Sequence, residues 1–110
     1  MNEREMLELA AKAMEINYSH DLGGYTQSYN SSSHFIKWNP RHDDGDTFRL
    51  AVKLRFSVSF NLASVEVECW QDECGVTREV IEYFDEPEEA TAAARLAITR
   101  AAAEVGKAMP

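Results

Sequence analysis

Apolar residues recur at helical spacing near the start of the chain. Between Asn2 and Ile16, one face of a helix would collect six of them: Met6, Leu7, Leu9, Ala10, Ala13 and Met14. Asn2 is a suitable N-cap, and the carboxylates of Glu3 and Glu5 suit the positive end of a helix dipole. The pattern predicts a first amphipathic helix from Asn2 to Ile16.

Two later segments show the same period. Carboxylates from Asp43 to Asp46 can cap a helix over about Asp46–Arg55, with a buried stripe of Leu50, Ala51 and Leu54. Pro87 fits the first turn of another helix. Its stripe reaches almost to the last residue: Ala90, Ala93, Ala94, Ala97, Ile98, Ala101, Ala102 and Val105. Its small side chains predict a close approach to a sheet.

Between these two helices the period changes to two, which is typical of strands. Apolar residues alternate from Val58 to Leu62, and they alternate in the opposite phase from Val65 to Cys69, so a turn near Ala63-Ser64 must reset the register. Val76–Phe84 is a third β-rich run. The polar segment from Gln71 to Gly75 predicts a hairpin loop in which Gly75 takes a positive φ. These runs predict an antiparallel meander.

The segment Asn17–Ser33 is rich in Tyr, Ser, Asn and Gly, and it predicts a loop that contains a short edge strand near Tyr25–Tyr29. A second short strand is predicted over His34–Trp38, ending at Asn39-Pro40 because proline cannot donate to a ladder.

The predicted fold class is therefore α+β. An antiparallel β-meander of three to four strands packs with three helices in an α/β/α-type sandwich, and the 110 residues form a single domain. The polar alternate positions of the strands favour one better-buried face of the sheet.

Charge narrows the choice of partners. Nineteen acidic residues against eleven basic ones give a net charge of −8, which repels phosphate backbones and anionic lipids. General nucleic-acid binding and membrane-surface binding are not expected, whereas a basic protein partner is favoured. No apolar run is long enough to span a bilayer, and the first residues lack the order of a signal peptide. We expect a cytoplasmic protein with reduced Cys69 and Cys74, one a buried strand thiol and the other a loop thiol.

Candidate reactive groups do not form a catalytic pattern. Cys69 and Cys74 lack the second ligand pair that structural zinc sites have. A calcium loop that starts at Asp43 would need Glu at its twelfth position, where Leu54 stands. The glycines form no phosphate-binding array. We expect a non-enzymatic protein with no metal and no cofactor.

Binding is the alternative to catalysis, and one short segment gathers suitable side chains. Trp38, Arg41 and His42, with Arg49 further along, could stack a base and hold a phosphate. Tyr25 and Tyr29 lie in a segment with the composition of an adaptable binding surface. The alternative is structural: Trp38 packs as a lid over the core, and the tyrosines cover one sheet edge.

Three parts of the chain resemble a known family. They are Glu5 to Ala13, the segment from Trp38 through Asp43-Asp44-Gly45-Asp46 to Leu54, and the last helix from Ala97 to Pro110. Together they cover roughly half of the chain and are similar to the small bacteriophage proteins grouped as the phage ABA sandwich domain. The resemblance implies an antiparallel sheet between helices and an origin in a phage or prophage, hence the cytoplasm of a bacterial host. It implies no catalytic residues.

Two functions are compatible with these features. In the first, a phage anti-defence protein sequesters a nucleotide-type immune signal within a dimer or higher homo-oligomer. In the second, a protein-directed inhibitor docks an acidic surface on a basic host defence protein. That surface would include eight carboxylates: Glu66, Glu68, Asp72, Glu73, Asp85, Glu86, Glu88 and Glu89. A phage protein with no defence role is a third hypothesis.

Overall fold

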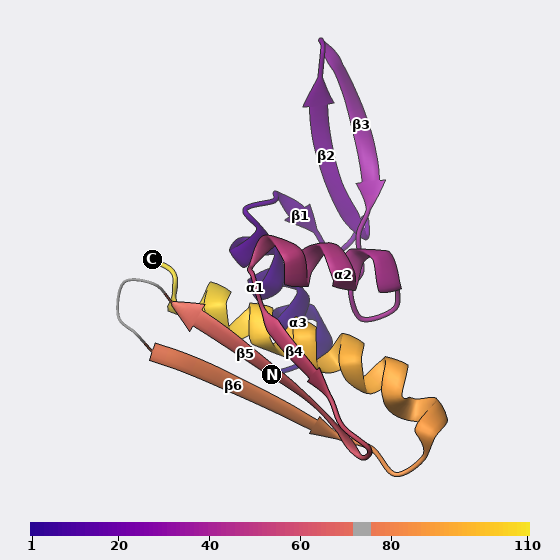
Figure 1. Ribbon diagram of the computed structural model, residues 1–110. Helices are drawn as coiled ribbons and strands as arrows, with labels where there is room; N and C mark the ends of the chain where they lie inside the picture. Colours follow the sequence, from indigo (N-terminus) through magenta and orange to yellow (C-terminus); the bar gives the residue numbers. More distant parts are fainter. Residues whose placement is uncertain (72–75) are drawn as a thin grey trace.

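The computed structural model describes residues 1–71 and 76–110 (Figure 1). Its helices are α1 (Glu3–Met14), α2 (Asp44–Lys53) and α3 (Ala90–Ala108), and a 3-10 turn, η1 (Pro87–Glu89), leads into α3. One antiparallel sheet contains β1 (Tyr18–Ser19), β2 (Gly24–Tyr29) and β3 (Ser32–Lys37). The other contains β4 (Ser57–Phe60), β5 (Ser64–Gln71) and β6 (Val76–Tyr83). The α+β class is confirmed.

Side-chain caps fix the starts of the first two helices. The Asn2 side chain accepts a hydrogen bond from the Glu5 backbone N–H at 2.8 Å, as the sequence predicts. The Asp43 side chain accepts a hydrogen bond from the Asp46 backbone N–H at 2.8 Å. The helix α2 therefore begins at Asp44, two residues before the predicted start at Asp46. The helix α1 ends where Glu15 adopts a left-handed conformation with φ 61°.

The meander β4–β5–β6 has the expected change of phase. Val58 pairs with Val67, and Phe60 pairs with Val65, across a turn formed by residues 61–63. Val67 and Cys69 are buried on β5, as is Val80 on β6. The predicted hairpin loop, with Cys74 as its thiol and Gly75 at its end, falls on residues 72–75, which lie outside the described residues.

Among the helices, α3 makes the extensive contact with this sheet, through β5 and β6. The polar alternate positions of β5, Glu66 and Glu68, are on the other face and are half-buried. The prediction of one better-buried face is therefore confirmed.

The second sheet was only partly foreseen. The sequence predicts short strands near 25–29 and 34–38, and the structure extends them and pairs them in a hairpin, with Thr26 opposite Phe35 and Tyr29 opposite Ser32. Its two-residue turn uses positive φ angles at Asn30 (48°) and Ser31 (68°). Figure 1 shows this hairpin, β2–β3, projecting from the rest of the molecule, and we call it the arm.

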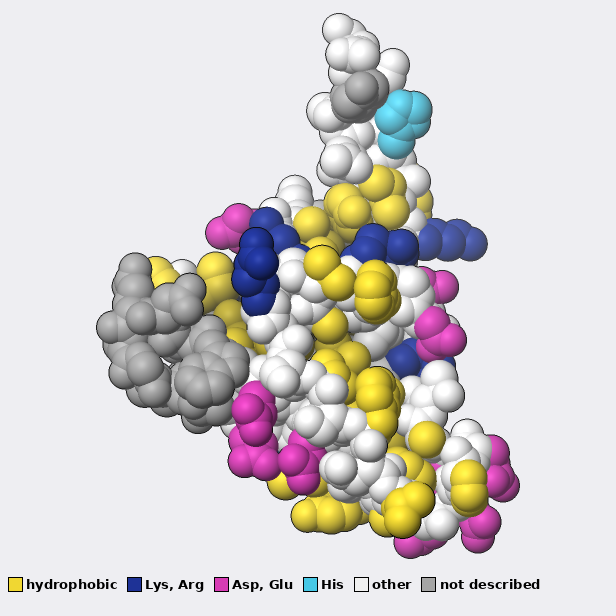
Figure 2. All heavy atoms as spheres, in the orientation of Figure 1, with side chains coloured by type: hydrophobic (Ala, Val, Ile, Leu, Met, Phe, Trp, Pro, Cys, Tyr) yellow, Lys and Arg dark blue, Asp and Glu magenta, His cyan; other side chains and the backbone are white. Residues whose placement is uncertain are grey.

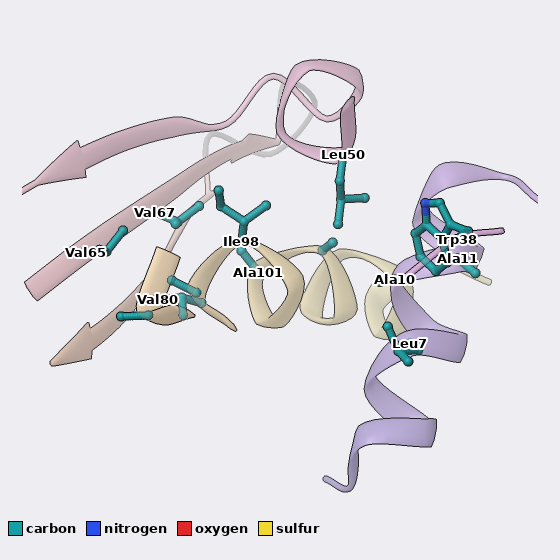
Figure 3. Close-up of a cluster of buried hydrophobic side chains, with 13 residues drawn as sticks. Leu7, Ala10, Ala11, Trp38, Leu50, Val65, Val67, Val80, Ile98 and Ala101 are labelled. Carbon is teal, nitrogen blue, oxygen red and sulfur yellow. The ribbon is translucent and has the colours of Figure 1, made fainter. Parts of the chain in front are cut away.

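The helix α3 is the central element of the core, and it contacts α1, α2, β5 and β6. Its small residues serve contact with α1 as well as with the sheet: a Cβ atom at Gly106 would lie 1.9 Å from the Leu9 carbonyl oxygen. Figure 3 shows the resulting core, with contributions from α1, α2, α3, the sheet and the segment after β3. It includes Leu7, Ala10, Trp38, Leu50, Val67, Val80, Ile98 and Ala101.

Candidate functional site

Three of the predicted ligand-binding residues line one hollow of about 440 Å³, which we call the Trp38 hollow. They come from different elements: Trp38 follows β3, His42 lies in the loop before α2, and Arg49 lies on α2. The loop is held because the Asn39 backbone N–H donates to the Asp46 carboxylate at 2.9 Å. The other lining residues are Gly23, Lys37, Asn39, Asp43 and Asp46.

Trp38 belongs mainly to the core. Only 3% of its surface is exposed, and its ring meets the Tyr18 ring edge-on, with 5.4 Å between centroids. Its indole Nε1 is buried and has no hydrogen-bond partner among the described residues. The interpretation of Trp38 as a lid packed over the core is confirmed.

Two side chains of the hollow, Arg49 and His42, already have carboxylate partners. The Arg49 Nη2 atom lies 2.7 Å from Asp46 Oδ1 and 3.8 Å from Asp43 Oδ2. The hydrogen bond that Arg49 donates to Asp46, helped by the charges of Asp46 and Asp43, raises the pKa of Arg49 above its ordinary value. His42 Nε2 lies 3.1 Å from a Glu3 carboxylate oxygen on α1.

Of the other three predicted residues, Arg41 and Tyr25 do not line this hollow. Arg41 is half-buried, and its carbonyl accepts a hydrogen bond from Arg95 Nε at 3.0 Å. Tyr25 is half-buried at the base of the arm, where it pairs with Tyr18 and packs on the core. Tyr29 lies at the outer end of the arm, beside the turn.

The charges of the Trp38 hollow offset one another. Lys37 and Arg49 line the hollow together with Asp43 and Asp46, so its wall has no excess of charged Lys and Arg side chains over carboxylates with which to attract a phosphate. Within residues 1–71 and 76–110, no group of three or more His, Cys, Asp or Glu side chains could hold a metal ion.

A second surface lies on the sheet, on the side away from α3. Glu66 and Glu68 of β5 share this side with Glu79, Ile81 and Tyr83 of β6, and we call these five residues the acidic face. Glu68 and Glu79 are directly opposite, an arrangement that destabilises a sheet by up to about 1 kcal/mol. Tyr83 is 75% exposed and gives the face an aromatic contact surface.

The wider acidic surface expected from the sequence is spread over several elements. Four of its carboxylates lie exposed before or within the turn that leads to α3: Asp85, Glu86, Glu88 and Glu89. Asp72 and Glu73 lie outside the described residues.

A third surface was not predicted. Phe48 and Val52 on α2 and Phe60 on β4 are 70%, 57% and 71% exposed. They line two neighbouring hollows of about 300 and 500 Å³, both of which also reach Ile98. We call this surface the apolar groove, and Figure 2 shows hydrophobic side chains gathered there over α2 and β4. Its sequence signal is the spacing of Phe48 and Val52, four residues apart and outside the buried stripe of α2.

None of the described helices is long and apolar enough to cross a bilayer. Comparison with known proteins finds no matching family model, no matching curated protein and no matching solved structure. The resemblance to the phage ABA sandwich domain therefore stays a prediction.

Proposed function

We propose that this chain is a non-enzymatic binding protein that docks its acidic face on a basic surface of a partner protein. The observation that carries the proposal is the pairing of Glu68 with Glu79, next to Glu66, on a side of the sheet that α3 leaves open. Like charges placed opposite each other lower the stability of the isolated sheet, and a cationic partner would relieve their repulsion.

The distribution of charge along the chain supports this choice. Residues 61–110 contain eleven acidic and four basic side chains, so most of the net charge of −8 belongs to the part that forms β5, β6 and α3. A concentrated field of one sign accelerates encounter with a partner of the opposite sign. Ile81 and Tyr83 add the apolar contacts that stable protein interfaces need.

The setting of this function follows from the resemblance. In a phage-encoded protein present in the bacterial cytoplasm, the basic partner would be a host defence protein, and the chain would act as its inhibitor. A phage role outside defence would use the same face on a different basic protein.

Sequestration of a nucleotide-type signal is less well supported, because the cations of the Trp38 hollow are matched by Asp43 and Asp46. It stays a prediction that calorimetry with cyclic dinucleotides and ADP-ribose derivatives can decide. Heat of binding that disappears in Arg49→Ala would establish it.

The test of protein docking is capture of partners from bacterial lysate by matched charge variants. Glu66→Lys/Glu68→Lys reverses two charges on the acidic face, and Glu15→Lys/Asp21→Lys makes the same change of net charge at exposed sites elsewhere. We expect the wild-type chain and the second variant to capture the same protein, and the first variant to lose it. Capture should weaken between about 50 mM and about 500 mM salt, because salt screens such contacts. Equal capture by both variants would contradict the proposal.

A further inference from the structure

We propose that the apolar groove is the interface of a two-fold homodimer, in which α2 of one copy lies antiparallel to α2 of a second copy. The proposal is independent of the acidic face, which lies on a different part of the molecule.

The first argument is the exposure of large apolar side chains at one place. Phe48 and Phe60 are each more than two-thirds exposed, and both line the two hollows on either side of them. An apolar surface of this kind on a water-soluble chain marks an interaction site. A projecting ring beside a hollow is also self-complementary, because the ring of one copy can enter the hollow of the other.

The second argument is the distribution of charge along α2. Asp46 of its first turn is buried and paired with Arg49. The exposed carboxylate of that turn is Asp44, which lies 2.6 Å from Arg95 of the same chain and whose side chain is 74% exposed. The last turn carries Lys53, with Arg55 just beyond. Figure 2 shows cationic side chains near the C-terminal end of α2, carboxylates together with cationic side chains near the other end, and hydrophobic side chains between them. In an antiparallel crossing, the acidic end of α2 in each copy lies beside the basic end of α2 in the other copy. The two helix dipoles then point in opposite directions, which is the favourable arrangement for neighbouring helices.

The third argument concerns repulsion between copies that each carry a net charge of −8. Residues 22–60, which form the arm, α2 and β4, contain five basic and three acidic side chains, so they are the part where two copies can meet with the least repulsion. A partner with charge of one sign would match only one end of α2. A second copy of this chain matches both ends.

Sedimentation equilibrium tests the assembly directly. We expect the wild-type chain to reach twice its monomer mass of 12.4 kDa at micromolar to millimolar concentration. Phe48→Ser should weaken the dimer about 100-fold, because an aromatic anchor is lost twice in a two-fold interface. Leu62→Ser is the matched control, since Leu62 is fully exposed and lines neither hollow of the groove. A wild-type monomer at all concentrations, or a dimer that Phe48→Ser leaves intact, would overturn the proposal.

A charge-exchange experiment tests the antiparallel arrangement. Asp44→Lys alone and Lys53→Glu alone each place like charges at both ends of the crossing, so each variant should be monomeric. An equimolar mixture should form a heterodimer, because Lys at 44 in one chain then meets Glu at 53 in the other, while the two unchanged residues still pair. Circular dichroism of each variant verifies that it is folded. Folded variants that fail to associate on mixing, when the wild-type chain is dimeric, would exclude this geometry.

Discussion

Leu50 and Phe48 are two positions apart on α2, yet the fold treats them in opposite ways. Leu50 is completely buried against α3, whereas Phe48 is 70% exposed. We expect Leu50→Ala to lower the free energy of unfolding by about 2–5 kcal/mol, because it leaves a cavity in the core. Phe48→Ala should change it by no more than about 0.5 kcal/mol.

Urea denaturation at submicromolar protein concentration measures both values without a contribution from association. A large loss of stability in Phe48→Ala would show that its ring belongs to the core of the monomer. That result would also remove the basis for the proposed dimer.

Tyr18 links the core to the segment after α1. Its ring packs on Trp38, and its hydroxyl lies 2.9 Å from His20 Nδ1. Burial is the main cause that raises the pKa of Tyr18 above its usual value near 10, and the carboxylates of Glu8 and Glu3 add to it.

The folded chain therefore holds the Tyr18 proton more tightly than the unfolded chain does. The resulting stabilisation is complete below about pH 10 and is lost as the pH rises through the higher pKa of the folded state. An absorbance titration of tyrosinate should show one late step that is missing in Tyr18→Phe and retained in Tyr83→Phe. A late step that survives in Tyr18→Phe would assign it to another phenol.

At the scale of elements, the crossing of α1 and α3 depends on Gly106. In a solvent-exposed helix, Gly→Ala stabilises by up to about 1 kcal/mol. Here the added Cβ would lie 1.9 Å from the backbone oxygen of Leu9, so the two helices must separate. We expect Gly106→Ala to lower the melting temperature and to cost about 1–3 kcal/mol.

The control for this change is Lys107→Ala, at an exposed position one residue further along α3. It should change the free energy of unfolding by less than about 0.5 kcal/mol. An increase in melting temperature for Gly106→Ala would mean that the two helices are further apart than the structure shows.

The arm is a hairpin that projects from the rest of the molecule, and Tyr25 near its base packs against the core. An isolated two-stranded hairpin is only marginally stable. Ser31 adopts φ 68°, which glycine tolerates better, so Ser31→Gly should stabilise the arm locally by about 0.5–1 kcal/mol. Hydrogen exchange at the amides of Gln27 and His34, which lie opposite each other in the arm, should slow several-fold, while exchange in β5 stays unchanged. Unchanged exchange in the arm would argue against this turn.

At the scale of the whole molecule, α3 is the element that connects the other helices with the meander. It contacts α1 and α2, and it also contacts β5 and β6, so none of these elements can lose its place without exposing the core. We expect a single unfolding transition. In a Trp70→Phe variant, fluorescence of Trp38 and far-ultraviolet circular dichroism should give the same urea midpoint. Two separate midpoints would divide the chain into independent units and would contradict the single-domain prediction.

The sequence alone determined the three helices and the meander. Their signals are local: the apolar period, the caps Asn2 and Asp43, and the change of phase before Val65 all lie within a few residues of the elements that they specify. The arm was harder to predict because its exposed Ser, Thr and Gln side chains carry no buried stripe, so only its backbone pairing defines it.

The tertiary structure decided which side chains the site can use. Trp38 is part of the core, and Arg49 pairs with the carboxylate of Asp46. His42 contacts the carboxylate of Glu3, which is 39 residues away from it in sequence. The same apolar character led to burial at Leu50 and exposure at Phe48, depending on which face of α2 met α3. The sequence pattern indicates which side chains are apolar and which are charged. The burial of a side chain and its ion-pair partners depend on elements that are distant in sequence and come into contact only when the chain folds.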